Sequence, residues 1–267
     1  MKIGILGCAG RMGRALLNEV IESDGCTLVG GTERAGSPAL GQDLGGLAGK
    51  DAIGLVANED ADGLIARADV VIEFSTVEAT LRHVALSAEH GTAQVIGTTG
   101  FDDHAREKIV SAAARSPLVW AANMSLGVNL LLGLTERVAQ SLGPEAFDIE
   151  IVEIHHRHKI DAPSGTALAL GEAAARGRNV HLADVADRGR DGVTGARKTG
   201  AIGFAALRGG DVVGDHTVTF AGLGERIELT HKASDRRIYA RGALHAARWL
   251  QGRPPGLYDM TDVLSLT

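Results

Sequence analysis

The first 120 residues alternate short apolar runs with segments whose apolar positions recur every three to four residues. Such runs are typical of buried strands, and the amphipathic segments between them are typical of helical crossovers in a parallel sheet. The pattern predicts strands at residues 2–6, 27–31, 70–74, 93–97 and 118–122. It predicts one helix with Met12, Leu16, Leu17, Val20 and Ile21 on a single face, and further helices near 77–89 and 103–115. We therefore expect a doubly wound parallel α/β domain, in which residues 34–68 are too weakly patterned to assign.

The pattern changes after Asn123. Helices are predicted at 127–142, 166–176 and 239–251, and strands at 147–154, 201–208, 216–221 and 226–232. Gly177 is expected to close the second helix, and a Gly-, Arg- and Asp-rich loop with solvated charges is expected to follow it. Consecutive strands of this kind predict a second, α+β domain built on a mixed sheet. The expected domains are residues 1–124, completed by 239–267, and residues 125–238.

Composition and charge exclude several classes of protein. With 267 residues, of which 45% are hydrophobic, the chain can bury a large core or two ordinary ones. The net charge of −6 argues against a nucleic-acid partner, because phosphate binding needs a basic face. No apolar run reaches the roughly 18 residues of a membrane span. Cys8 and Cys26 match neither a disulfide framework nor a zinc spacing. We expect a cytoplasmic protein with no membrane partner.

A glycine motif, Gly7-Cys8-Ala9-Gly10-Arg11-Met12-Gly13, joins the first predicted strand to the first helix. Glycines there allow a tight turn and let a pyrophosphate approach the backbone at the helix N-terminus. A turn without a ligand would have the same composition. Glu33, at the end of the second strand, is suitably placed for the adenosine ribose, and Arg34 either binds a 2′-phosphate or lies unpaired on the surface. The motif predicts a Rossmann-type domain that accepts both NADH and NADPH.

Two more loops follow predicted strands of the same sheet, Gly97-Thr98-Thr99-Gly100 and Ala121-Ala122-Asn123-Met124-Ser125. Open α/β sheets bind ligands at the carboxyl ends of their strands, where small residues would let a nicotinamide ring lie against backbone. Ordinary turn chemistry explains either loop alone equally well.

Residues 155–166, H-H-R-H-K-I-D-A-P-S-G-T, form the densest group of proton-transfer and anion-binding residues. Histidines titrate near neutrality, and Lys159 adds a positive charge. Ser164 is the predicted N-cap of the next helix, whose first amides attract an anion. An extended strand would place His155 and Lys159 about 13 Å apart, which is too far for both to contact one small substrate. We therefore expect the chain to bend between residues 157 and 163. Metal binding is the less favoured alternative, because no carboxylate or cysteine lies at a familiar ligand spacing.

Together these motifs resemble the dihydrodipicolinate reductase family of bacterial and plant diaminopimelate and lysine synthesis. The resemblance covers nearly the whole chain, through G-x-x-G-R-M-G, G-T-T-G, A-A-N-x-S-x-G-V-N, H-H-R-H-K-x-D-A-P-S-G-T-A, R-x-G-D-V-V-G-D-H-T and G-E-R-I-E-L-T-H-K-A. One departure is Val77, where many relatives carry proline. The resemblance implies a dinucleotide-binding domain, a substrate-binding domain that forms a homotetramer, and hydride transfer from NADH or NADPH to a small cyclic dicarboxylate.

The same resemblance implies roles for the matching residues. His155 would be the acid that protonates the substrate, with Lys159 as its catalytic partner. His156, Gly165 and Thr166 would hold the substrate's carboxylates, together with the helix N-terminus at Ser164. The cofactor would contact Gly7, Cys8, Ala9, Gly10, Arg11, Met12, Glu33, Arg34, Gly97, Thr98, Thr99, Ala121, Ala122, Asn123 and Met124. No metal is implied.

Two other functions fit part of the chain. A different NAD(P)-dependent dehydrogenase, acting on an amino-acid semialdehyde, would explain the first domain and leave the histidine-rich segment without a purpose. A non-catalytic NADPH sensor would bind the cofactor without turnover. The expected substrate is a cyclic imine that carries two carboxylates. Oxidation of the reduced cofactor by this imine, but not by semialdehydes, distinguishes the expected reductase from both alternatives.

Overall fold

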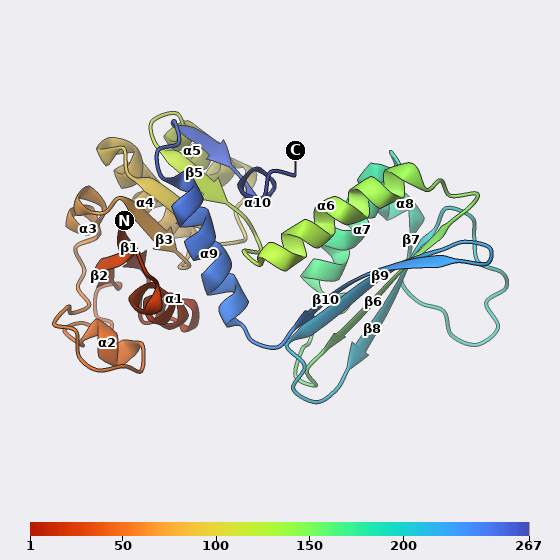
Figure 1. Ribbon diagram of the computed structural model, residues 1–267, viewed down its shortest axis with the longest axis horizontal. Helices are drawn as coiled ribbons and strands as arrows, with labels where there is room; N and C mark the ends of the chain where they lie inside the picture. Colours follow the sequence, from red (N-terminus) through yellow and green to blue (C-terminus); the bar gives the residue numbers. More distant parts are fainter. Residues whose placement is uncertain (267) are drawn as a thin grey trace. The chain divides into compact units, whose positions relative to one another are not determined.

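The computed structural model describes residues 1–266, and the chain divides into two compact units (Figure 1). The first unit comprises Met1–Leu126 and Arg237–Ser265, and the second comprises Gly127–Arg236 with Leu266. Within residues 1–266, no helix combines the length and apolar character needed to cross a membrane.

Six parallel strands form the sheet of the first unit. They are β1 (Lys2–Leu6), β2 (Thr27–Thr32), β3 (Val70–Glu73), β4 (Ala93–Ile96), β5 (Pro117–Trp120) and β11 (Gly256–Tyr258). Their order is β11-β5-β4-β3-β1-β2, so β2 lies on one side of β1 and the later strands lie on the other. In open α/β sheets a ligand binds outside the carboxyl ends of the strands at such a switch point. The predicted doubly wound sheet is confirmed, with β11 as an unpredicted addition.

Helices cover both faces of this sheet. On one face lie α1 (Arg11–Glu22) and α9 (Arg237–Leu250), and on the other α3 (Ala61–Arg67), α4 (Val77–His90) and α5 (Asp103–Ala113). The strands are therefore buried on both sides, which explains why they read as continuous apolar runs. The C-terminal segment belongs to this unit, because α9 packs on α1 and on β3 to β5, with α10 (Met260–Val263) against it.

Residues 34–68, which the hydrophobic pattern leaves unassigned, contain the short helix α2 (Leu44–Leu47) as well as α3. Asp43 organises this segment, since its carboxylate accepts hydrogen bonds from the backbone N–H groups of residues 45, 46, 53 and 54. These bonds, first of all the one from Ile53, hold the pKa of Asp43 below its usual value. Because hydrogen bonds to Asp43 hold this segment in place, its sequence needs little hydrophobic periodicity, which explains why the pattern left it unassigned.

Val77 is the first residue of α4. Thr76 caps the helix, because its Oγ1 accepts a hydrogen bond from the N–H of Ala79 at 3.3 Å. The first helical position needs no N–H partner, so proline and valine are both compatible with it. Valine at position 77, where many relatives carry proline, therefore leaves this loop and the cap of α4 intact.

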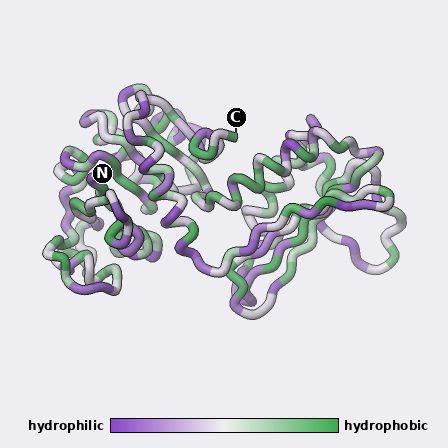
Figure 2. Tube along the Cα trace, viewed as in Figure 1, coloured by the Kyte–Doolittle hydropathy of each residue, from purple (hydrophilic) through white to green (hydrophobic). Residues whose placement is uncertain are grey.

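The second unit is built on a mixed five-stranded sheet. Its strands are β6 (Asp148–His155), β7 (Ala186–Asp187), β8 (Ile202–Arg208), β9 (Gly214–Ala221) and β10 (Arg226–Ala233), in the order β10-β9-β6-β8-β7. β6, β8 and β7 run parallel, whereas β9 is antiparallel to β6 and to β10. α6 (Leu126–Ser141) and α7 (Gly165–Gly177) pack on one face. Burial accordingly alternates along β9, where residues 214, 216, 218 and 220 are buried, and hydrophobic and hydrophilic residues are mixed along the strands of this sheet (Figure 2).

Gly177 ends α7 for a different reason from the one expected. It is the last helical residue and not a left-handed cap; the positive φ, 55°, belongs to Asn179. A Cβ on Gly177 would lie 2.3 Å from the carbonyl oxygen of Glu136 in α6. The glycine therefore allows α6 and α7 to pack closely.

The segment after α7 also differs from the expected solvated loop. It contains α8 (Leu182–Val185) and β7, and its Arg197 side chain is only 17% exposed. The Arg197 guanidinium donates to the carboxylates of Asp148 and Glu150 at 2.7 and 2.8 Å, and to the backbone carbonyls of Ile149 and Ala201. The Arg197 guanidinium is therefore paired with carboxylates and holds the segment against β6, whereas the sequence predicted charges exposed to solvent.

Candidate functional site

The glycine motif of the first unit forms the turn between β1 and α1. Gly7 has a φ of 77°, which favours glycine, and Gly10 caps α1 without a side-chain hydrogen bond. A Cβ on Gly13 would lie 2.1 Å from the Gly7 carbonyl oxygen, so the helix can approach the turn only with glycine there. The turn is tight and the start of α1 lacks a side-chain cap, an arrangement that fits a pyrophosphate.

Glu33 follows β2 and reaches this turn. Its Oε1 accepts a hydrogen bond from the N–H of Ala9 at 2.8 Å, and the neighbouring Arg34 is exposed. The structure therefore brings together the two parts of the motif that the sequence predicts. Cys8 is fully buried, and burial, followed by the charge of Glu33, raises its pKa to about 12. Cys8 is a packing residue whose backbone alone is suited to contact a cofactor.

The two loops after β4 and β5 lie at the same edge of the sheet, but their residues differ in exposure. Thr99 and Ala122 are exposed, and Ala121 and Asn123 are half-buried. Thr98 is buried, and its Oγ1 bonds the N–H of Ser75 at 3.2 Å and the hydroxyl of Thr80 at 2.9 Å. Met124 belongs to the core of the first unit, and a Cβ on Gly97 would collide with the Phe74 ring. Packing thus accounts for Gly97, Thr98 and Met124.

Glu73, at the end of β3, is a buried carboxylate that sequence reasoning missed. It is inaccessible to solvent and bonds His83 Nδ1 and Gln94 Nε2, each at 2.9 Å, and the Ser75 hydroxyl. Ser75 begins the loop beside the switch point. Glu73 therefore fixes the start of the loop that follows β3.

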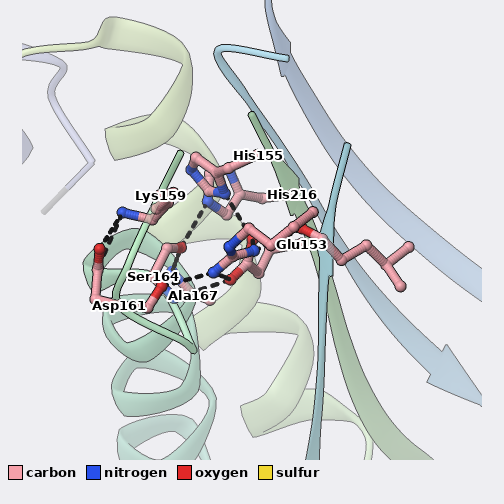
Figure 3. Close-up of polar contacts among 9 residues, drawn as sticks. Glu153, His155, Lys159, Asp161, Ser164, Ala167 and His216 are labelled. Carbon is pink, nitrogen blue, oxygen red and sulfur yellow. Dashed lines mark hydrogen bonds and ion pairs between the residues drawn. The ribbon is translucent and has the colours of Figure 1, made fainter. Parts of the chain in front are cut away.

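In the second unit, His155 is the last residue of β6 and lies against Glu153 (Figure 3). His155 Nδ1 and Glu153 Oε2 are 2.6 Å apart, and the His155 side chain is 11% exposed. A Cβ at Gly214 would lie 2.8 Å from His155 Nε2, so glycine at 214 leaves room for the imidazole. Because Glu153 occupies Nδ1, Nε2 is the nitrogen that remains for a substrate.

Glu153 is 1% exposed and accepts hydrogen bonds on both oxygens. Arg208 binds it in a bidentate manner at 2.7 and 2.9 Å, and the N–H of Ser164 donates to Oε1 at 3.0 Å. Burial is the largest single influence and opposes ionisation. The hydrogen bonds from Arg208, His155 and Ser164 together outweigh it and hold the pKa of Glu153 below its usual value.

Ser164 is the N-cap of α7, as predicted, with its Oγ accepting from the N–H of Ala167 at 3.1 Å. The same Oγ lies 3.0 Å from Nε2 of His216, a buried histidine on β9. His216 pairs with Glu153 across the two strands, and its ring meets that of His155 edge to face at 5.1 Å. Burial, followed by the charge of His155, lowers the pKa of His216 to about 4.

Lys159 lies in the connection between β6 and α7. The chain turns immediately after the strand, where the N–H of Lys159 bonds the carbonyl of His156, so the predicted bend is present. The Lys159 ammonium contacts both oxygens of Asp161 at 2.8 and 2.9 Å (Figure 3). Arg208 donates to the Asp161 carbonyl at 2.6 Å and so ties the connection to Glu153.

Several positively charged groups act on His156, in the connection that leads to α7. Desolvation, followed by the charges of Arg236, His158, His155 and Lys159, lowers the pKa of His156. A Cβ on Gly165 would meet no atom within 4 Å, so the helix start is open at this residue. A helix N-terminus beside several cations is suited to carboxylates. Residues 1–266 contain no group of three or more His, Cys, Asp or Glu side chains arranged to hold a metal ion.

Sequence reasoning missed Glu153, Arg208 and His216, although part of the signal was present. Residues 149, 151, 153 and 155 of β6 are buried and the intervening ones are not, so the period of two puts Glu153 on the same inward face as His155. His216 occupies the equivalent face of β9. A glutamate or histidine at an inward position is an informative exception.

Comparison with known proteins agrees with this geometry. Models of the dihydrodipicolinate reductase N-terminus and C-terminus match residues 1–124 and 127–264. Relatives named 4-hydroxy-tetrahydrodipicolinate reductase from Parvibaculum lavamentivorans and from Brucella abortus (strain 2308) are 59% and 52% identical, over 100% of this chain and 98% and 99% of theirs. Both units are matched, so the histidine-rich segment belongs to the same family pattern as the glycine motif.

Solved structures share the fold. A dipicolinate-bound dihydrodipicolinate reductase from Paenisporosarcina sp. TG-14 superposes with a TM-score of 0.80 at 22% identity, over 98% of both chains. An amine dehydrogenase from Mycobacterium smegmatis superposes with a TM-score of 0.58 at 13% identity, over 96% of this chain and 94% of that one. Matches to both halves and identity over the full length show that the chain belongs to the dihydrodipicolinate reductase family of NADH- or NADPH-dependent oxidoreductases.

Proposed function

We propose that this chain reduces 4-hydroxy-tetrahydrodipicolinate to tetrahydrodipicolinate with NADH or NADPH, in diaminopimelate and lysine synthesis. The observation that carries the proposal is the buried His155–Glu153 pair, which lies at the start of α7, where the N–H of Ser164 donates to Glu153. A dicarboxylate that must take up a proton needs both features in one place. The names of the full-length relatives supply the substrate.

In the first unit, the backbone of Gly7 to Met12 receives the pyrophosphate at the start of α1, and Glu33 receives the adenosine ribose. Arg34 is exposed beside Glu33 and receives the 2′-phosphate of NADPH. The nicotinamide lies along the loops of Gly97 to Thr99 and Ala121 to Met124, where Thr99 and Ala122 are the exposed residues. In this proposal the buried side chains of Thr98 and Met124 hold the two loops in shape by packing beneath them.

In the second unit, the start of α7 at Ser164, Gly165 and Thr166 receives one carboxylate of the substrate. Lys159 and His156 receive the other, with the substrate replacing Asp161 as the partner of the Lys159 ammonium. Ammonium and helix N–H groups both favour an anion, so the site selects a small dicarboxylate over a neutral aldehyde.

The bound reduced cofactor supplies a hydride to C4 of the ring that forms when the substrate loses water. Addition of the hydride leaves an electron-rich enamine, which must take up one proton. His155 delivers this proton from Nε2, because Nδ1 is held by Glu153. The contact of Glu153 with Nδ1 fixes the orientation of the ring.

A homotetramer completes the proposal. α6 and α7 cover one face of the mixed sheet, whereas Val152 and Leu207, on its other face, are 36% and 51% exposed. An uncovered sheet with free edges is protected when another subunit packs on it.

Steady-state oxidation of NADH and NADPH tests the function, with substrate formed in situ from pyruvate and aspartate semialdehyde by the preceding synthase. We expect turnover with both cofactors. His155→Ala should lower kcat by about 10²- to 10⁴-fold, the contribution of a general acid, and Lys159→Ala by at least as much. His156→Ala should act mainly on KM, because carboxylate contacts are already made in the ground state.

The matched control is His158→Ala, an exposed histidine of the same segment. It should behave as the wild type, and all variants should keep their NADPH dissociation constants. A near-normal kcat for His155→Ala would show that the acid is another group.

Arg34→Ala should weaken NADPH binding by about 1.5–3 kcal/mol and leave NADH binding almost unchanged, because only NADPH carries the 2′-phosphate. Titration of both cofactors measures this difference. Arg115→Ala, an exposed arginine near the opposite edge of the sheet, is the control. Equal losses for the two cofactors would remove Arg34 from the phosphate site.

Light scattering at micromolar concentration tests the assembly. The expected mass is four times the 27.7 kDa of one chain. A monomer would refute the tetramer and leave the uncovered sheet face without an explanation.

A further inference from the structure

His216 is a buried histidine whose ring meets the capping serine of α7. It is 4% exposed, Nε2 lies 3.0 Å from Ser164 Oγ, and Nδ1 has no hydrogen-bond partner within residues 1–266. Burial, followed by the charge of His155, lowers the pKa of His216 to about 4, so the ring is neutral at neutral pH. A neutral imidazole carries its proton on one nitrogen and a lone pair on the other.

The surroundings of the ring decide which nitrogen of His216 carries the proton. A proton on Nδ1 would leave a buried N–H without an acceptor, and orphaned buried N–H groups are rarer than under-satisfied acceptors. A proton on Nε2 has an acceptor, because Ser164 Oγ lies within hydrogen-bond distance. The favoured tautomer therefore has Nε2–H donating to the serine hydroxyl.

This tautomer determines what the Ser164 hydroxyl can do. Its oxygen accepts one hydrogen bond from the N–H of Ala167 at 3.1 Å and a second from His216. A hydroxyl has two lone pairs and one proton, so its proton remains for a third partner. Ser164 is itself only 2% exposed, but a Cβ on the next residue, Gly165, would meet no atom within 4 Å, so an anion that approaches this end of the helix is the candidate for that partner.

We propose that His216 is a positioning residue that holds the Ser164 hydroxyl as a hydrogen-bond donor toward a substrate carboxylate. The inference rests on the proposed function, because it assumes a carboxylate at the start of α7. In the opposite tautomer, His216 would take the serine proton, and Ser164 would turn an oxygen lone pair toward the carboxylate. His216 thus acts on the substrate through Ser164.

The test compares His216→Leu with His216→Gln in the full-length protein. Glutamine can keep an N–H donor near the position of Nε2, whereas leucine removes it. His216→Leu should raise KM for the cyclic imine and the dissociation constant of dipicolinate by about 10- to 100-fold, the worth of a hydrogen bond to a charged group. The same variant should lower kcat by a smaller factor than it raises KM, and it should leave the dissociation constant of NADPH unchanged. His216→Gln should restore most of the dipicolinate affinity.

A double-mutant cycle separates positioning from general damage. In a Ser164→Ala background, His216→Leu should cause no further loss of dipicolinate affinity, because the histidine acts through the serine. The control is His231→Gln, which changes the half-buried histidine opposite His216 on β10 and should leave dipicolinate affinity unchanged.

Additive losses in the cycle, or a His216→Gln variant as poor as His216→Leu with intact NADPH binding, would overturn the inference. A wild-type protein that neither binds dipicolinate nor reduces the cyclic imine would overturn the proposed function instead, and the inference would fall with it.

Discussion

The geometry of the second unit depends on the hydrogen bonds made to the buried carboxylate of Glu153. An ionised carboxylate is tolerated in a protein interior only when donors surround it. Here the donors are His155 on the same strand, Arg208 on β8 and the N–H of Ser164 at the start of α7, so one side chain fixes three elements. Because the folded pKa of Glu153 is lowered, its stabilisation is present at neutral pH and is lost as the pH falls through that pKa.

In the proposed function each unit receives an anion at the start of a helix, but the two helices are capped differently. Gly10 at the start of α1 has no side chain, which leaves space for a bulky pyrophosphate. Ser164 at the start of α7 adds a hydroxyl, which suits a small carboxylate that needs a directed hydrogen bond. In this proposal the same helical electrostatics serve a cofactor in one unit and a substrate in the other, and the cap residue adapts each helix to its ligand.

The sequence predicted the elements with strong periodicity and missed features that depend on tertiary contacts. The buried strands and the Ser164 cap could be predicted, because apolar runs and capping residues are local signals. α2 and β11 span four and three residues, which is too short for a period to appear. The pairing of Glu153 with His216 requires the register of β6 against β9, which no local pattern specifies. For the same reason, the packing roles of Thr98 and Met124 became visible only in the folded chain.

The central claim is that Glu153 makes His155 a competent acid by holding its Nδ1. The most direct measurement is kcat for Glu153→Gln in the wild-type and His155→Ala backgrounds, with the thermal unfolding curve of each variant as a check on folding. An amide in place of the carboxylate removes the negative charge and can present an N–H group instead of an oxygen to Nδ1, so the hydrogen bond that holds the ring is weakened or reversed. The account predicts a loss of about 10²- to 10⁴-fold in the wild-type background and almost none when His155 is already absent. A Glu153→Gln variant with full kcat, or one whose loss is undiminished without His155, would contradict it.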